Sequence, residues 1–117
     1  HSHPDDESFY ILSGVGELYA ETDKDTKWNK VKAGDLAHLP GGIKHAWRNL
    51  SDKPLESIVT TNPALGRFFL EVGRPIQHGQ RLPPPTQEDL QHFAEVSERY
   101  GHWLASPEEN AQVGINI

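Results

Sequence analysis

His1-Ser2-His3-Pro4-Asp5-Asp6-Glu7 opens the chain and supplies two imidazoles and a carboxylate. A second stretch, Gly34-Asp35-Leu36-Ala37-His38-Leu39-Pro40-Gly41-Gly42-Ile43-Lys44-His45, ends on one more imidazole just after a Pro-Gly-Gly turn. Three histidines and one glutamate are a suitable ligand set for a divalent transition metal. The two stretches therefore predict a metal site, and that site is where we expect the chemistry of the protein.

The spacing of these residues suits a site built on strands. Side chains alternate faces along a strand, so His1 and His3 share a face, and Glu7 returns to it if the bend at Pro4 keeps the parity. His45 lies far beyond Glu7 and must come from another strand. A folded scaffold is needed to hold both segments together.

The absence of cysteine narrows the kind of metal site. It excludes zinc and iron–sulfur sites that depend on thiolates. The histidine and glutamate ligands suit Fe(II), Mn, Ni, Co, Cu or Zn. On a six-coordinate ion they leave positions open for substrate, O₂ or water, which favours a catalytic role over a purely structural one.

The same residues resemble the two motifs of the cupin family. The first family motif has a His-x-His pair followed by a Glu and then a Gly, and the second has a Gly, a Pro-x-Gly turn, a His and an Asn. Each motif matches here with the expected gaps, at His1, His3, Glu7 and Gly14, and at Gly34, Pro40, Gly42, His45 and Asn49. The stretch 9–14 is especially similar to single-domain cupins related to quercetin dioxygenases.

This resemblance implies a fold and a ligand set. It implies an all-β domain, a double-stranded β-helix (jelly-roll) barrel with a metal inside. It also implies that His1, His3, Glu7 and His45 hold one divalent transition metal ion, with Fe(II) favoured among the candidates. The family's first motif normally begins with a Gly before the first His, and strands precede it. Because the sequence begins at that His and contains no Met, we expect an N-terminal segment with one or more strands to precede it.

The first residues also allow three other interpretations. A free terminal amine together with His3 binds Cu(II) or Ni(II) in a square plane, a free His1 chelates through its own amine and imidazole, and the stretch also resembles a purification-tag remnant. None of these explains Glu7, Gly14 or the second motif.

Composition limits the partners and the location. The chain has 117 residues, a net charge of −6 and scattered lysines and arginines, which argues against nucleic acid because that partner favours a basic patch. No apolar run approaches the roughly 20 residues that span a bilayer. We expect a small-molecule substrate and no membrane partner. The lack of cysteine is compatible with a reducing, cytoplasmic location.

The remaining patterns predict a barrel followed by a helical extension. Strands are expected over 8–12, 17–21, 28–31, 36–39, 45–49 and 55–61, with a charged hairpin tip over 22–26. A short helix is expected over 64–72 and an amphipathic helix over 87–100, capped by Thr86. A last helical turn is expected from Ser106-Pro107. We predict two parts, a barrel over 1–73 and a connector with helices over 74–117 that pack on the barrel.

Strand parity divides the residues of the first strand between two faces. Phe9 and Ile11 share the parity of Glu7 and are expected to face the metal cavity. Tyr10 and Leu12 then face outward and need a cover, for which a second copy of the chain is the simplest candidate. We therefore expect a homodimer.

Candidate substrate-contacting residues are chosen for their position relative to the motifs: Phe9, Ile11, His38, Trp47 and Phe68. For Trp47 an ordinary place in the core is an equal alternative. For Phe68 plain packing against the barrel is the preferred one, and His38 is the weakest of the set. Glu7 is the candidate catalytic base.

These features favour a metal-dependent dioxygenase that acts on an aromatic, phenolic or related small molecule. An isomerase or decarboxylase that needs no O₂ is one alternative, and activity without O₂ would distinguish it. A cupin that binds a metal or small molecule without turnover is another, because a fold does not fix a function.

Overall fold

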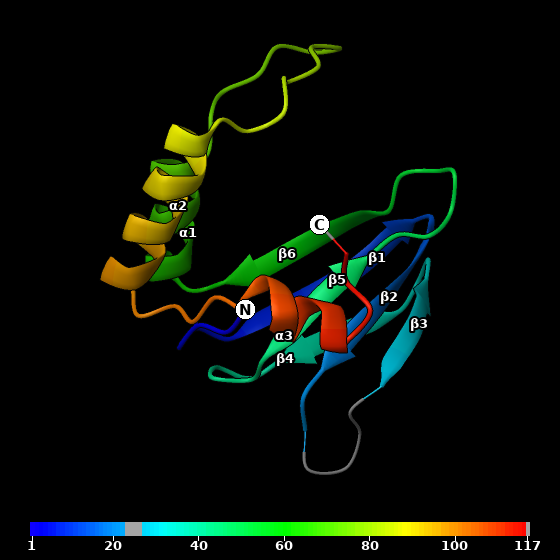
Figure 1. Cartoon of the computed structure of the whole chain (residues 1–117). Helices are drawn as coiled ribbons and strands as arrows, with labels where there is room; N and C mark the ends of the chain where they lie inside the picture. Colours follow the sequence, from blue (N-terminus) through cyan, green and yellow to red (C-terminus); the bar gives the residue numbers. More distant parts are fainter. Residues whose placement is uncertain (23–26, 117) are drawn as a thin grey trace. The chain divides into compact units, whose positions relative to one another are not determined.

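The computed structural model describes residues 1–22 and 27–116 (Figure 1). By their contacts the residues form two compact units, His1–Asn62 and Pro63–Ile117. We call them the strand unit and the helical unit. Most of the expected hairpin tip, residues 23–26, lies outside the described residues.

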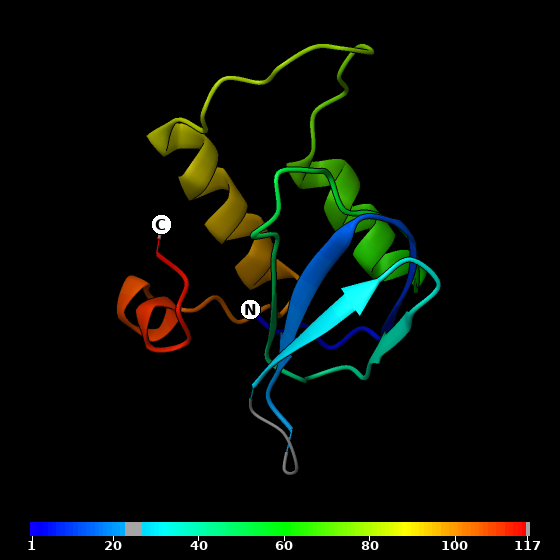
Figure 2. The ribbon, with the colours of Figure 1, turned by 90° about the vertical axis from the view of Figure 1, so that its right-hand side faces the viewer.

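The strand unit contains two three-stranded antiparallel sheets (Figures 1 and 2). The first sheet has the order β4-β1-β6, and the second has the order β3-β2-β5. Their bounds are β1 Glu7–Ser13, β2 Val15–Ala20, β3 Trp28–Lys32, β4 Leu36–Leu39, β5 His45–Arg48 and β6 Glu56–Thr61. The six strands and the jelly-roll class agree with the sequence prediction. Within the described residues, the sheets form a sandwich with free edges and do not close into a barrel.

Gly14 lets β1 turn directly into β2. Its φ is +82°, and a Cβ at this position would overlap the carbonyl oxygen of Pro54. A residue with a side chain would therefore be strained in its backbone and would also displace the loop before β6. This explains physically why a glycine follows the first strand.

The two faces of the first sheet differ in burial. On the inner face Glu7 and Ile11 are 5% and 1% exposed, whereas on the outer face Tyr10 and Leu12 are 46% and 49% exposed. The alternation follows the period of two in a strand. The apolar interior of the strand unit is completed by three more buried side chains, Leu18, Val31 and Leu39.

The helical unit has a core of its own. It contains α1 Pro63–Val72, α2 Gln87–Arg99 and α3 Pro107–Gln112. Leu65 and Phe68 of α1 pack with Val96 of α2. Thr86 caps α2 in a capping box, as predicted, because its hydroxyl accepts from the Asp89 N–H while the Asp89 carboxylate accepts from the Thr86 N–H.

The division between the units differs from the predicted one. The prediction grouped residues up to 73 with the barrel, whereas the contacts of α1 group it with the helical unit, from residue 63 onward. The physical reason is that Leu65 and Phe68 find their apolar partners on α2. Packing of the extension on the barrel stays a prediction.

Among the described helices, none is long and apolar enough to cross a membrane. The expected cytoplasmic location is not tested by this finding and stays a prediction.

Candidate metal centre

Backbone hydrogen bonds bring the two motif segments side by side. The N–H of His45, at the start of β5, donates to the carbonyl of His1 at 2.9 Å. The N–H of Gly42 donates to the carbonyl of His3 at 2.7 Å. Segments far apart in the sequence therefore lie next to each other, as the spacing of the motifs predicted.

Gly41 permits a very close approach of the Pro-Gly-Gly turn to the first motif. A Cβ at this position would overlap the carbonyl of Pro4. The Gly41 N–H also donates to Oδ1 of Asp6 at 2.6 Å. A glycine is therefore required here for backbone contact and not for a left-handed conformation.

The four predicted ligands form one group, which we call the ligand cluster: His1, His3, Glu7 and His45. The Nε2 atoms of His1 and His45 are 3.0 Å apart. Oε2 of Glu7 lies 3.0 Å from Nε2 of His3 and 3.5 Å from Nε2 of His45. Ligand atoms of the three histidines all lie within 4.8 Å of one another. The ring planes of the histidines are inclined by 69–83°, so that ring edges meet at the centre.

The hydrogen bonds behind the rings fix which nitrogen faces the centre. Nδ1 of His3 is 3.0 Å from the carbonyl oxygen of Asp5, and Nδ1 of His45 is 2.8 Å from that of Ile43. A carbonyl can only accept, so each Nδ1 carries the hydrogen, and Nε2 of a neutral ring presents a lone pair. Nε2 of His3 and Oε2 of Glu7, which lie 3.0 Å apart, then need a proton or a metal ion between them. The donor set thus fits a metal, with the backbone contacts that orient histidine ligands already in place.

Burial increases the electrostatic coupling in the cluster. His3, Glu7 and His45 are buried, and His1 is exposed. Burial opposes ionisation of Glu7, but hydrogen bonds and charge interactions with His3 and His45 outweigh it and lower its pKa to about 2. The hydrogen bond to Glu7 raises the pKa of His3 above its ordinary value, although burial acts in the opposite direction. The hydrogen bond between His3 and Glu7 therefore favours the protonated form of His3 and the ionised form of Glu7 in the metal-free protein.

Asp5 is a buried carboxyl that the sequence patterns do not single out. It is 6% exposed, and its Oδ1 accepts from Nδ2 of Asn62 at 2.7 Å. Its Oδ2 lies 3.9 Å from Nδ1 of His3. Asp5 therefore ties the segment that holds His3 to the end of β6. No sequence signal identifies this contact, because Asn62 lies at the far end of the strand unit's sequence.

Two of the predicted substrate residues meet next to the ligand cluster. Phe9 follows Glu7 by two residues on β1, and Trp47 follows His45 by two residues on β5. Their ring centroids are 4.9 Å apart. Ile11, one step further along β1, is 1% exposed and belongs to the apolar core.

Of the other two predicted residues, the structure places His38 away from the cluster and Phe68 in the helical unit. His38 is exposed on the outer face of β4, where its Nδ1 lies 2.8 Å from Oγ of Ser8. It pairs in register with Ser8, so it points away from the side that Glu7 and Leu39 share. Phe68 lies in the core of the helical unit.

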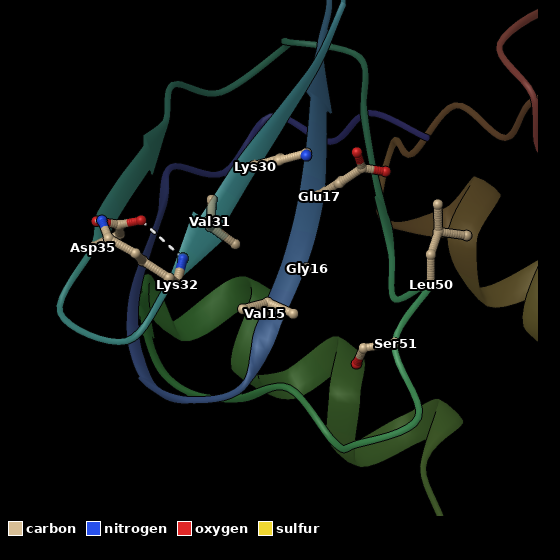
Figure 3. A pocket seen from close by; sticks show the side chains of 9 residues that line it. All are labelled: Val15, Gly16, Glu17, Lys30, Val31, Lys32, Asp35, Leu50 and Ser51. Carbon is tan, nitrogen blue, oxygen red and sulfur yellow. Dashed lines mark hydrogen bonds and ion pairs between the residues drawn. The ribbon is translucent and has the colours of Figure 1, made fainter.

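The described residues of the strand unit line at least two hollows. One of about 380 Å³ includes Glu7 in its lining, together with polar residues at the end of β6. The other, about 650 Å³, contains none of the ligand cluster (Figure 3). In the close-up, Lys32 and Asp35 form an ion pair at its border, and Val15 and Leu50 contribute apolar side chains. Of these two hollows, the smaller is the one whose lining includes a residue of the ligand cluster, Glu7.

Comparisons with known proteins identify the family to which the strand unit is similar. Residues 1–61 match the family model described as a cupin domain. The chain is 34% identical over 91 residues to acireductone dioxygenase 4 of Oryza sativa subsp. japonica, covering 76% of this chain and 42% of the relative. It is 46% identical over 55 residues to an acireductone dioxygenase of Yarrowia lipolytica, covering 45% and 31%. It is 43% identical over 53 residues to an uncharacterized protein of Aquifex aeolicus, covering 44% and 40%.

These matches differ in how much of each protein they cover. The chain spans less than half the length of each of these relatives. The rice match covers 76% of the chain, which is more than the strand unit, so it extends into the helical unit. The predicted similarity to quercetin dioxygenases in particular stays a prediction.

Proposed function

Because the chain belongs to the cupin domain family, we propose that it is a metal-dependent dioxygenase whose substrate is a small molecule with an acidic enol-type hydroxyl. The observation that carries the proposal is the ligand cluster, three imidazoles and one carboxylate facing a common centre. Such a set suits Fe(II) and related ions and leaves positions open. Dioxygenases among the relatives support this class of reaction.

The proposed substrate class covers two groups of compounds, acireductones and phenols, which share an acidic hydroxyl on an unsaturated carbon. An acireductone, the compound after which two of the relatives are named, is an enediol next to a ketone. A phenol or flavonol, expected from the aromatic lining, carries the same kind of acidic hydroxyl on an unsaturated carbon. We propose that the acireductone is the preferred substrate, because two of the relatives are named after it.

The residues of the chain have separable tasks in this proposal. His1, His3, Glu7 and His45 would hold one divalent ion, for which we propose Fe(II). The ion would supply charge stabilisation and access to the chemistry of O₂. Glu7 is ionised at neutral pH, as its low pKa requires, and we propose that it accepts the proton of the substrate hydroxyl. Phe9 and Trp47 would exclude water beside the cluster and orient the organic part of the substrate.

Oxygen consumption by the complete protein loaded with Fe(II) tests the proposal. We expect O₂ uptake with an acireductone, and uptake with quercetin or a simple phenol would instead favour the aromatic class. The variant His45→Ala should lose the activity, and His38→Ala, which alters an exposed residue on the outer face, should keep it. Turnover without O₂ would contradict the proposal, as would metal-loaded protein that consumes no O₂ with any of these compounds.

We also propose that the chain forms a homodimer through the outer face of the first sheet. Tyr10 pairs in register with Leu36 on one side and with Ile58 on the other. These three apolar side chains are 46%, 69% and 52% exposed. A row of this kind favours a protein partner. Sedimentation of the wild type should give twice the mass of one chain. Ile58→Lys should reduce the measured mass to that of one chain. An unchanged mass in this variant would exclude the outer face of the first sheet as the dimer interface.

A further inference from the structure

The larger hollow of the strand unit has the size of a small-molecule site and lies apart from the ligand cluster. Its volume is about 650 Å³, within the range of roughly 300–1,000 Å³ that holds small organic molecules. Parts of β2 and β3 line it, together with Asp35 and the segment that follows β5 (Figure 3). The described residues of its lining include none of the proposed metal ligands. A molecule bound here would therefore not need the metal.

Three charged side chains form a row across the outer face of the second sheet, opposite the buried side chains of Leu18 and Val31. Glu17 pairs in register with Lys30 on one side and with Arg48 on the other. Oε2 of Glu17 lies 2.6 Å from Nε of Arg48. Within the part of the chain that the structure describes, Lys30 has no ion-pair partner. The row therefore carries one positive charge in excess, at the ammonium of Lys30, which lines the hollow.

Exposed apolar side chains border the hollow beside this charged row. Val15 lies two residues before Glu17 on β2, so the two side chains share a face and are roughly 7 Å apart along the strand. Val15 is 52% exposed, and Leu50, which also lines the hollow, is 75% exposed. A molecule that covers these side chains would remove apolar surface from water. The hollow thus offers apolar contacts next to an uncompensated ammonium.

The remaining charges at the border limit the charge of a matching ligand. Nζ of Lys32 lies 3.1 Å from Oδ1 of Asp35, so this pair adds no net charge. A dianion would have a single excess ammonium available and would face the carboxylates of Glu17 and Asp35. The net charge of the chain is −6, which disfavours general attraction of anions. A molecule with one negative charge and an apolar body fits this set of groups.

We propose that the larger hollow is a second small-molecule site, which binds an organic monocarboxylate with an aliphatic body. The carboxylate accepts a hydrogen bond from the ammonium of Lys30, and the aliphatic body covers Val15 and Leu50. The inference is independent of the proposed dioxygenase function, because it involves none of the ligand cluster.

Octanoate tests the inference, because it carries one carboxylate on an aliphatic chain long enough to reach from Lys30 to Val15. The complete protein with its metal is titrated with octanoate, and the methyl resonances are followed by ¹³C NMR. We expect the resonances of Val15 and Leu50 to move and to reach a plateau. Acetate, which lacks the aliphatic body, and 1-octanol, which lacks the charge, should each bind about 5-fold or more weakly. Equal affinity of either compound and octanoate would overturn the proposed match.

Two lysine variants separate the hollow from general charge effects. Lys30→Gln removes the excess charge and should weaken octanoate binding about 5-fold, as expected for an ion pair that is partly open to solvent. Lys53→Gln removes the charge of an exposed lysine outside the lining and is the matched control, with unchanged affinity expected. Both substitutions alter exposed side chains, so both variants should fold.

Two further outcomes would overturn the inference and leave the proposed function intact. One is equal octanoate affinity in Lys30→Gln and Lys53→Gln, or resonances of Val15 and Leu50 that octanoate does not move. The other is movement of these resonances with protein concentration alone, which would assign the hollow to contact with a second copy of the chain.

Discussion

The interior of the strand unit is stabilised differently at its two ends. At one end the buried side chains of His3 and His45 each place a ring nitrogen within 3.5 Å of Oε2 of Glu7. At the other end Ile11 and Val31 are buried without polar groups, and their stability depends on removing apolar surface from water. The polar end offers atoms that can bind an ion. The apolar end contributes the free energy of burial that holds the two sheets together.

We expect the largest effect from a substitution at the polar end, in the ligand cluster. His45→Ala removes a ring that contacts both His1 and Glu7. Removing a residue that only hydrogen-bonds to a metal ligand lowers metal affinity roughly 10–100-fold. Because His45→Ala removes a proposed ligand itself, we expect metal affinity to fall by more than about 100-fold. Metal analysis after dialysis measures this, with His38→Ala as control. Equal metal content in wild type and His45→Ala would assign the metal to another site, such as a chelate at the N-terminus.

We expect the next largest effect from a substitution at the apolar end. Ile11→Ala should lower the free energy of unfolding by about 2–5 kcal/mol, because it removes a buried side chain and leaves a cavity. Urea unfolding of the metal-free protein measures the change. Leu70→Ala, which alters an 84% exposed leucine of α1, should cost much less. Similar costs for the two variants would contradict the assignment of Ile11 to the apolar core.

A smaller effect tests the close backbone contact near the ligands. Gly41→Ala places a methyl group against the carbonyl of Pro4, so the turn must shift relative to His3. We expect about 10-fold weaker metal binding, comparable with the loss of a supporting contact. Gly66→Ala in α1, where no atom lies within 4 Å of the added Cβ, is the control and should slightly stabilise its helix. Unchanged metal affinity in Gly41→Ala would mean that the two segments are more loosely joined.

The smallest effect concerns pH and the metal-free polar end. The folded pKa of Glu7 is lowered from 4.5 to about 2, so its contribution to stability is complete above pH about 4.5 and is lost as the pH falls towards about 2. The raised pKa of His3 acts with the opposite sign, because its contribution is lost as the pH rises through the folded pKa. Thermal unfolding of wild type and Glu7→Gln across acid pH measures the Glu7 part. A parallel decline in both proteins would assign the acid sensitivity to other carboxyl groups.

Much of this arrangement could be predicted from sequence because strands have a short, regular period. Parity placed Glu7 and Ile11 on one face of β1 and Tyr10 on the other, and the structure has them so. The same rule, applied to β4, would have placed His38 outward, since its neighbour Leu39 faces the interior. His38 was chosen for its position between motif residues, which says nothing about the face it occupies.

The features that sequence did not reveal depend on distant contacts. Asp5 meets Asn62, and Gly41 meets Pro4, only after the sheets have assembled. The packing of α1 against Val96 of α2 is a distant contact of the same kind, because Val96 is far along the chain.

The hydrogen bonds that join His1 to His45 and His3 to Gly42 also bear on biosynthesis. A ribosome extends a chain at roughly 5–20 residues per second, so the three N-terminal ligands leave the exit tunnel seconds before the fourth. During that interval the early ligands would offer only an open, weak chelate. The proposed centre would be complete only once the two segments have paired. A folded strand unit would then acquire the metal, and the availability of ions in the compartment where folding finishes would decide which ion is bound.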